Sequence, residues 1–202
     1  MSEIRIPTQK RSIEKREKII EIGFQLMCEE GYHNIGTTEI ANKAGISTGI
    51  IYQYFNDKKE IFIEGVKNYS TSIMYPMLDI LENSEIKIDN IDLLITNMVD
   101  KFIDSHTISK RAHEELLAMS HLDEDISNIF KSNEIEMTNK IVTILKKNNI
   151  NIKNCKEKVH IIIGIIDNLC HEIVYHKHSE INYDTMKKEV VNIIINIIKN
   201  SY

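Results

Sequence analysis

Residues that make tight turns are scarce in this chain, with seven Gly and two Pro among 202 residues. Trp is absent, whereas Ile, Leu, Lys, Glu and Asn are abundant. A protein built of many short strands needs more turn formers, so this composition favours long helices. We therefore expect an all-α fold, in a chain long enough for one large domain or for a small domain and a larger one.

Apolar residues recur at helical spacing along most of the chain. The first helix is expected at 13–30, and two short helices separated by Gly45 follow within 36–56. A fourth helix begins after Asp57 and must kink or stop at Pro76. Further helices are expected near residues 89–105, 109–120, 123–148, 155–178 and 184–200, which makes about nine helices.

The charge is distributed unevenly. A net charge of −5 counts by itself against a nucleic-acid binder, but the first twenty residues hold six basic and three acidic side chains. Cys28, Cys155 and Cys170 match neither a disulfide framework nor paired zinc ligands. The longest apolar run is far shorter than the ~20 residues of a membrane-spanning helix. We expect a soluble, cytoplasmic protein that does not enter a membrane.

The segment around Gly45 has the features of a helix-turn-helix. Ala41 and Ala44 are small enough for two helices to cross closely, and Gly45 permits the turn. Ile40, Ile46, Ile51 and Phe55 can close a small core. Hydroxyl and amide side chains, which suit phosphates and base edges, remain for the outer face of the second helix.

The span from about Lys15 to Lys67 resembles the DNA-binding domain of the TetR family of bacterial transcriptional regulators. The resemblance rests on the end of the first helix, "EEGY", and on the run "IANKAGISTGIIYQYFNDKKEIF". Ile35 and Gly36 depart from the family pattern, which usually has hydroxyl residues there. The resemblance implies a three-helix DNA-binding head at 1–68 and a helical ligand-binding and dimerisation domain at 69–202.

The resemblance also implies which residues lie at DNA. It places Thr38, Ser47, Thr48, Tyr52 and Lys58 against phosphates. It places Thr37, Gly49, Ile50, Gln53 and Tyr54 near base edges or the adjoining backbone. The basic residues Lys10, Arg11, Lys15, Arg16 and Lys18 are further candidates for phosphate contacts.

The sequence of the second domain does not identify its ligand. Met and aromatic side chains suit adaptable apolar pockets, although each is also an ordinary core residue. The candidates for a pocket lining are Met74, Tyr75, Met77, Met98, Phe102, His106, His113, Met119, Phe130 and Met137. The segments 155–178 and 184–200 are apolar on more than one face, so we expect them to form a homodimer interface.

One polar stripe runs through the Ile-rich segment 155–178. On a helix, His160, Gly164, Asp167, His171, Tyr175 and His178 share one face. Three interpretations remain open: a dimer seam, a polar pocket wall that includes Asp167, His171 and Tyr175, or a metal site that uses Asp167, His171 and a third group. No zinc-type ligand set is complete in the sequence, and we expect no cofactor.

The sequence favours a ligand-released repressor that binds a palindromic operator as a homodimer. An activator, a regulator without a small ligand and an architectural DNA-binding protein are the alternatives. An enzyme is not expected, because no convergent acid, base or nucleophile set is present. Cys170 and His171 are neighbours that point about 100° apart on a helix and so cannot form a nucleophile–base pair there.

Overall fold

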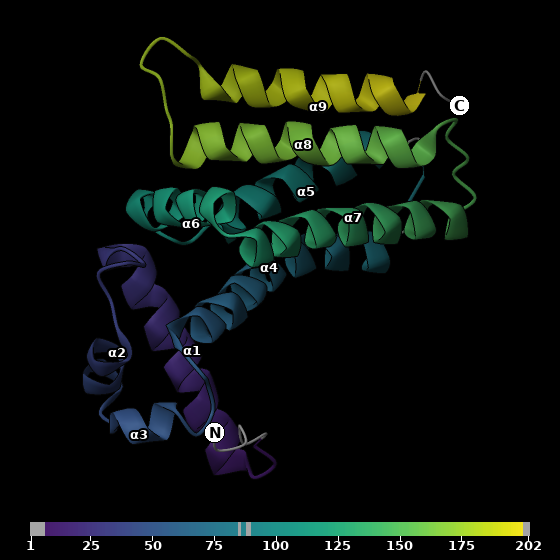
Figure 1. Ribbon diagram of the computed structural model, residues 1–202. Helices are drawn as coiled ribbons and strands as arrows, with labels where there is room; N and C mark the ends of the chain where they lie inside the picture. The colour runs from purple at the N-terminus through teal and green to yellow at the C-terminus, as the bar shows by residue number, and fades with distance from the viewer. Residues whose placement is uncertain (1–6, 85, 88–89, 200–202) are drawn as a thin grey trace. The chain divides into compact units, whose positions relative to one another are not determined.

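The computed structural model describes residues 7–84, 86–87 and 90–199. Over these residues it is all-α, as predicted, without strands. The nine helices of this part of the chain are α1 (Lys10–Glu30), α2 (Thr37–Ala44), α3 (Thr48–Ile51), α4 (Lys58–Asn83), α5 (Ile91–Ser105), α6 (Lys110–Leu122), α7 (Glu124–Lys147), α8 (Cys155–Val174) and α9 (Tyr183–Lys199) (Figure 1). The expected helix ends at 89 and 200, and residues 1–6 of the expected head, lie outside the described residues.

The helices form two compact units, and both α4 and α7 contribute to each of them. The first unit contains the chain up to Tyr69 together with Ile108–Phe130. The second contains Ser70–Thr107 and the chain from Lys131 onward. The functional division into 1–68 and 69–202 stays a prediction, and the structure adds that α6 and the start of α7 group with the N-terminal residues.

The core of the first unit is built on the apolar faces of α1 and α4. Ile20 and Met27 of α1 are buried with Phe62 of α4. The two helices approach closely because Gly65 has no side chain: a Cβ there would lie 2.4 Å from the Cβ of Phe24. The apolar face of α1 is therefore buried in the second half of the helix, whereas Ile13 near its start is exposed.

Helix α6 completes this core. Ala112, Leu116 and Met119 are buried in the same cluster as the side chains of α1 and α4. The Glu115 carboxylate accepts a hydrogen bond of 2.6 Å from the backbone N–H of Tyr32. The first three helices therefore share their core with a helix that follows them by about eighty residues in sequence.

The second unit contains a helix that continues through a proline. We expected α4 to kink or stop at Pro76, but it runs on to Asn83. Met77, Leu78 and Leu81, which follow the proline, are all buried. Burying each such side chain is worth about 1.5–3 kcal/mol, which exceeds in sum the ~3 kcal/mol cost of a proline inside a helix.

Helices α5, α7, α8 and α9 supply the rest of this second core. Helix α8 ends at Val174 rather than near 178, because the N–H groups of Tyr175 and His176 both bond to the carbonyl of His171. Within the described part of the chain, none of the helices has the length and apolar character needed to cross a membrane.

The neighbours Leu116 and Leu117 on α6 test whether this helix stabilises the first unit. Leu116 is 3% exposed and Leu117 is 37% exposed. We expect Leu116→Ala to lower the free energy of unfolding by about 2–5 kcal/mol, because it leaves a cavity in the shared core. Leu117→Ala is the control and should change it by less than about 0.5 kcal/mol. Urea unfolding followed by circular dichroism measures both, and equal effects would contradict the role assigned to α6.

Candidate nucleic-acid interface and effector region

The turn between α2 and α3 depends on a left-handed residue. Gly45 has φ 70° and ψ 37°, a region that side chains with a Cβ rarely adopt. Its N–H donates to the carbonyl of Asn42, and the N–H of Ile46 donates to Ala41. These two bonds close the C-terminus of α2 in a Schellman-type cap and direct the chain into α3. Ile40 and Ile51 meet in the core beneath, as the motif predicts.

The start of α2 is capped without a hydroxyl. Gly36 occupies the N-cap position, and its N–H donates to the carboxylate of Glu39 over 2.9 Å. This is half of a capping box, since Gly36 has no side chain to return a bond. The Thr37 hydroxyl instead lies 3.0 Å from the Tyr52 hydroxyl, which ties the first turn of α2 to the end of α3.

The exposed part of this motif is polar. Of the ten residues predicted at DNA, five are exposed: Thr38, Ser47, Gly49, Tyr52 and Gln53. Four are partly buried: Thr37, Thr48, Ile50 and Lys58. Tyr54 differs from the prediction, because it is only 5% exposed and packs in the core of the first unit. The exposed hydroxyl and amide groups therefore lie on α2, at the N-cap of α3 and in the turn after α3.

Lys58 has intramolecular partners that the sequence did not reveal. Its ammonium donates to the carbonyls of Tyr32 and Ile35 at 2.6 and 2.8 Å and lies 4.5 Å from the centre of the Tyr32 ring. These contacts hold the loop between α1 and α2 against the start of α4. In the structure Lys58 therefore acts as a tether between this loop and α4. A contact of Lys58 with phosphate stays a prediction.

Two cations of the basic N-terminal segment also bind within the unit. The Arg16 guanidinium pairs with Glu64 at 2.9 Å and lies 5.0 Å from the centre of the Phe55 ring. Lys18 donates to the carbonyl of Ala44 at the end of α2. Partial burial raises the pKa of Glu64, but hydrogen bonds from Lys67 and Arg16 outweigh it, so this pKa lies below its ordinary value.

The predicted pocket residues are spread over both units. His113, Met119 and Phe130 belong to the first unit. In the second unit Tyr75 is exposed and Met74 is partly buried. Met77 and Met98 line an apolar cavity of about 70 Å³ together with Ile and Leu side chains, most of them from α5, α7, α8 and α9. Met137 is buried in the same core. Phe102, His106, Asp167, His171 and Tyr175 gather at the end of α5 and along α8.

The polar stripe of α8 divides among different neighbours. His160 lies beside α7, with a ring nitrogen 3.2 Å from the Thr138 hydroxyl and the other 3.4 Å from Glu134. A Cβ on Gly164 would meet nothing within 4 Å. Asp167 and His171 meet at 3.6 Å, as their spacing predicts. His178 lies beyond the end of α8, so the predicted stripe is wrong at that end.

Part of the first unit matches a known protein family. Residues 19–64 match the family model described as "Bacterial regulatory proteins, tetR family". Over these residues the chain matches the TetR family. This match covers α1 from its second half, the whole of α2 and α3, and the start of α4.

Individual relatives agree with this chain over different lengths. The HTH-type transcriptional regulator HbdR of Aromatoleum sp. (strain CIB) is 44% identical over 55 residues, which are 27% of this chain and 24% of HbdR. A fatty acid metabolism regulator protein of Bacillus subtilis (strain 168) is 24% identical over 132 residues, or 65% of this chain and 61% of that protein. The matched part of the chain thus spans about a quarter of the length of HbdR and about three fifths of the length of the Bacillus subtilis protein.

A solved structure supports the TetR-family fold over most of the chain. A TetR-family transcriptional regulator from Syntrophomonas wolfei, as that structure is described, superposes with a TM-score of 0.69 at 18% sequence identity. The superposition covers 93% of this chain and 96% of the other. At that identity the likeness shows the fold alone, and it covers residues well beyond 19–64.

Gly45 provides a test of the turn. We expect Gly45→Ala to lower the free energy of unfolding by roughly 1–2 kcal/mol, because a Cβ disfavours the left-handed backbone, whereas the space around it is open. Gly45→Asn should lose less, since Asn tolerates this conformation. Gly49→Ala inside α3 is the control and should not destabilise the protein. Equal stability of Gly45→Ala and the parent chain in urea unfolding would contradict the requirement for glycine.

Proposed function

We propose that this protein is a sequence-specific transcriptional repressor that binds a palindromic operator as a homodimer and is released by a small-molecule effector. The observation that carries the proposal is the set of exposed polar side chains at the two ends of α3, in a helix-turn-helix that matches the TetR family. Ser47 and Tyr52 offer hydroxyl donors for phosphate oxygens, which fix the register on the duplex. Gln53 offers an amide that can pair with both edge atoms of an adenine in the major groove.

The structure supports this proposal through the rigidity of the motif. Gly45, the Thr37–Tyr52 contact and the Lys58 tether each restrain one side of the α2–α3 pair. Rigid positioning matters because hydrogen bonds to base edges require groups held within a narrow range of distance. Gly49 is exposed at the start of α3, so the helix can approach the bases closely at that point.

Selection of bound fragments from random duplexes at about 150 mM salt tests the function. We expect one palindrome whose half-sites are centred about 34 Å apart, or a small multiple of that distance, because a two-fold dimer inserts one α3 into each half-site. Weak, salt-sensitive binding without a consensus would instead favour an architectural DNA-binding protein.

The selected operator then tests Gln53. We expect Gln53→Ala to relax sequence preference at one base pair per half-site and to lose about 1–3 kcal/mol of discrimination there. Asn128→Ala is the matched control, because Asn128 is an exposed amide of the same unit outside α2 and α3. Competition titrations against base-substituted operators measure both variants. An unchanged preference in Gln53→Ala would show that Gln53 does not contact a base.

The proposed dimer uses α8 and α9, which run antiparallel side by side (Figure 1). Ile161 of α8 and Ile193 of α9 are exposed, although both helices also bury apolar side chains in the second core. The open space over Gly164 leaves room for a close approach of another helix. A second copy of the chain is the partner that a palindromic operator requires.

Charge substitution tests the dimer. Ile161→Asp should shift the protein towards monomer, since a carboxylate in an apolar interface loses its hydration without gaining a partner. Ile135→Asp on α7 is the control, because Ile135 is also an exposed Ile, 43% against 54% for Ile161, but lies on neither α8 nor α9. Sedimentation velocity at several protein concentrations measures the oligomeric state. The proposal fails if both variants remain as dimeric as the parent chain.

The small size of the cavity in the second unit supports release of DNA by an effector. Its volume of about 70 Å³ is well below the ~300–1,000 Å³ of typical small-molecule sites, and its lining of Ile, Leu and Met is adaptable. An organic effector would therefore bind better to a conformation in which these helices lie further apart. Such differential affinity is what shifts a population away from the DNA-binding state.

A further inference from the structure

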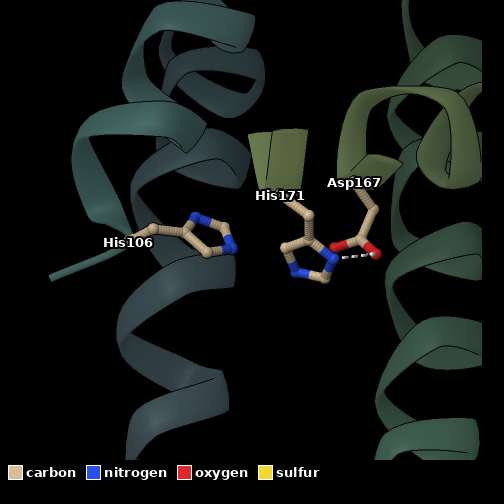
Figure 2. A group of neighbouring side chains, drawn as sticks. All are labelled: His106, Asp167 and His171. Carbon is tan, nitrogen blue, oxygen red and sulfur yellow. Dashed lines mark ion pairs between the residues drawn. The ribbon is translucent and has the colours of Figure 1, made fainter. Parts of the chain in front are cut away.

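Three metal-ligating side chains meet in the second unit. His106 lies at the C-cap of α5, and Asp167 and His171 lie one turn apart on α8. One ligand atom from each of the three residues lies within 4.8 Å of the other two. Figure 2 shows the ring of His106 turned towards His171, with Asp167 on the other side of His171. The sequence left the third ligand of this set open, and the fold supplies it.

The hydrogen bonds of His106 determine which of its nitrogens faces the cluster. Its Nδ1 lies 2.8 Å from the backbone carbonyl of Phe102. A carbonyl oxygen only accepts, so Nδ1 carries the proton and Nε2 of the neutral ring carries the lone pair. Burial lowers the pKa of His106, which keeps the ring neutral. Metal-binding histidines commonly donate their other N–H to a backbone carbonyl in this way.

The other two ligands are already paired. His171 Nδ1 and Asp167 Oδ2 lie 3.6 Å apart. In a tetrahedral site with bonds of about 2.0–2.1 Å, neighbouring ligand atoms lie roughly 3.3 Å apart. The 3.6 Å pair nearly meets this separation, and the longest separation in the cluster requires an approach of roughly 1.5 Å. Side-chain rotations of the partly exposed Asp167 and His171 can provide that movement.

We propose that His106, Asp167 and His171 bind one divalent transition-metal ion of the class that includes Zn²⁺, Co²⁺ and Ni²⁺. Two imidazoles and one carboxylate suit this class better than Mg²⁺ or Ca²⁺, which prefer oxygen ligands alone. Three protein ligands leave at least one coordination position for water or for an anionic group of another molecule.

The surroundings of the site are consistent with this assignment. The Phe102 ring lies 4.8 Å from the His106 ring, and the Tyr175 ring lies 6.0 Å from that of His171, so aromatic groups shield the ligands. The buried Cys170 thiol lies 3.1 Å from His106 Nδ1. An ion also needs far less space than an organic effector.

A cobalt titration of the metal-free full chain tests the site without DNA, so its outcome is independent of the proposed regulatory function. We expect visible d–d absorption that saturates at one Co²⁺ per chain and is displaced by Zn²⁺. His171→Gln and Asp167→Asn should each weaken binding by more than about 10-fold, the smallest loss seen when even an outer-shell partner is removed. Both residues are partly exposed, so neither variant is expected to disturb the core, and far-UV circular dichroism verifies this.

His160→Gln is the matched control. His160 lies on the same helix and beside a carboxylate, Glu134, but outside the cluster. It should bind Co²⁺ as the parent chain does, and the parent should gain thermal stability with Zn²⁺ because the ion binds the folded state. Two results overturn the proposal: no saturable cobalt absorption with the parent chain, or an equal loss in His160→Gln and His171→Gln, which would indicate adventitious binding by surface histidines.

Discussion

The left-handed backbone at Gly45 sets the angle at which α3 leaves α2, and the candidate DNA surface depends on that angle. Two hydrogen bonds, from Gly45 to Asn42 and from Ile46 to Ala41, hold the turn. Ile40 and Ile51 then bury their side chains beneath it. Because the apolar side chains are buried in the core, Ser47, Gly49 and Gln53 are left exposed. Their hydrogen-bonding groups are therefore available to a duplex.

Three of the cations near this motif bind groups within the first unit. Lys58 binds two carbonyls of the loop between α1 and α2, Lys18 binds the last carbonyl of α2, and Arg16 pairs with Glu64. A cation at a helix C-terminus also interacts favourably with the helix dipole. Counting basic residues therefore overstates the charge available to DNA. The specificity proposed here rests more on exposed hydroxyl and amide groups than on net charge.

Polar residues on α8 acquire different roles from the helices that face them. His160 contacts α7, whereas Asp167 and His171 lie beside His106 at the end of α5. The Nδ1 of His106 bonds to a backbone carbonyl, which leaves the lone pair on its Nε2. Between His160 and Asp167, a Cβ added at Gly164 would meet no atom of the described residues within 4 Å. One stripe thus contributes to a candidate metal site and to a candidate dimer face, and the three interpretations of the sequence are not mutually exclusive.

The sequence alone determined what depends on local spacing. Helical periodicity and scarce turn formers predicted the all-α fold, the Gly45 turn and the pairing of Asp167 with His171, because residues four apart share a helix face. Tertiary packing decided the rest: the passage of α4 through Pro76, the burial of Tyr54, the position of α6 in the first core and the meeting of His106 with α8. His106 and His171 are far apart along the chain. Contacts between such residues depend on which helices pack together, and local sequence periodicity does not predict that packing.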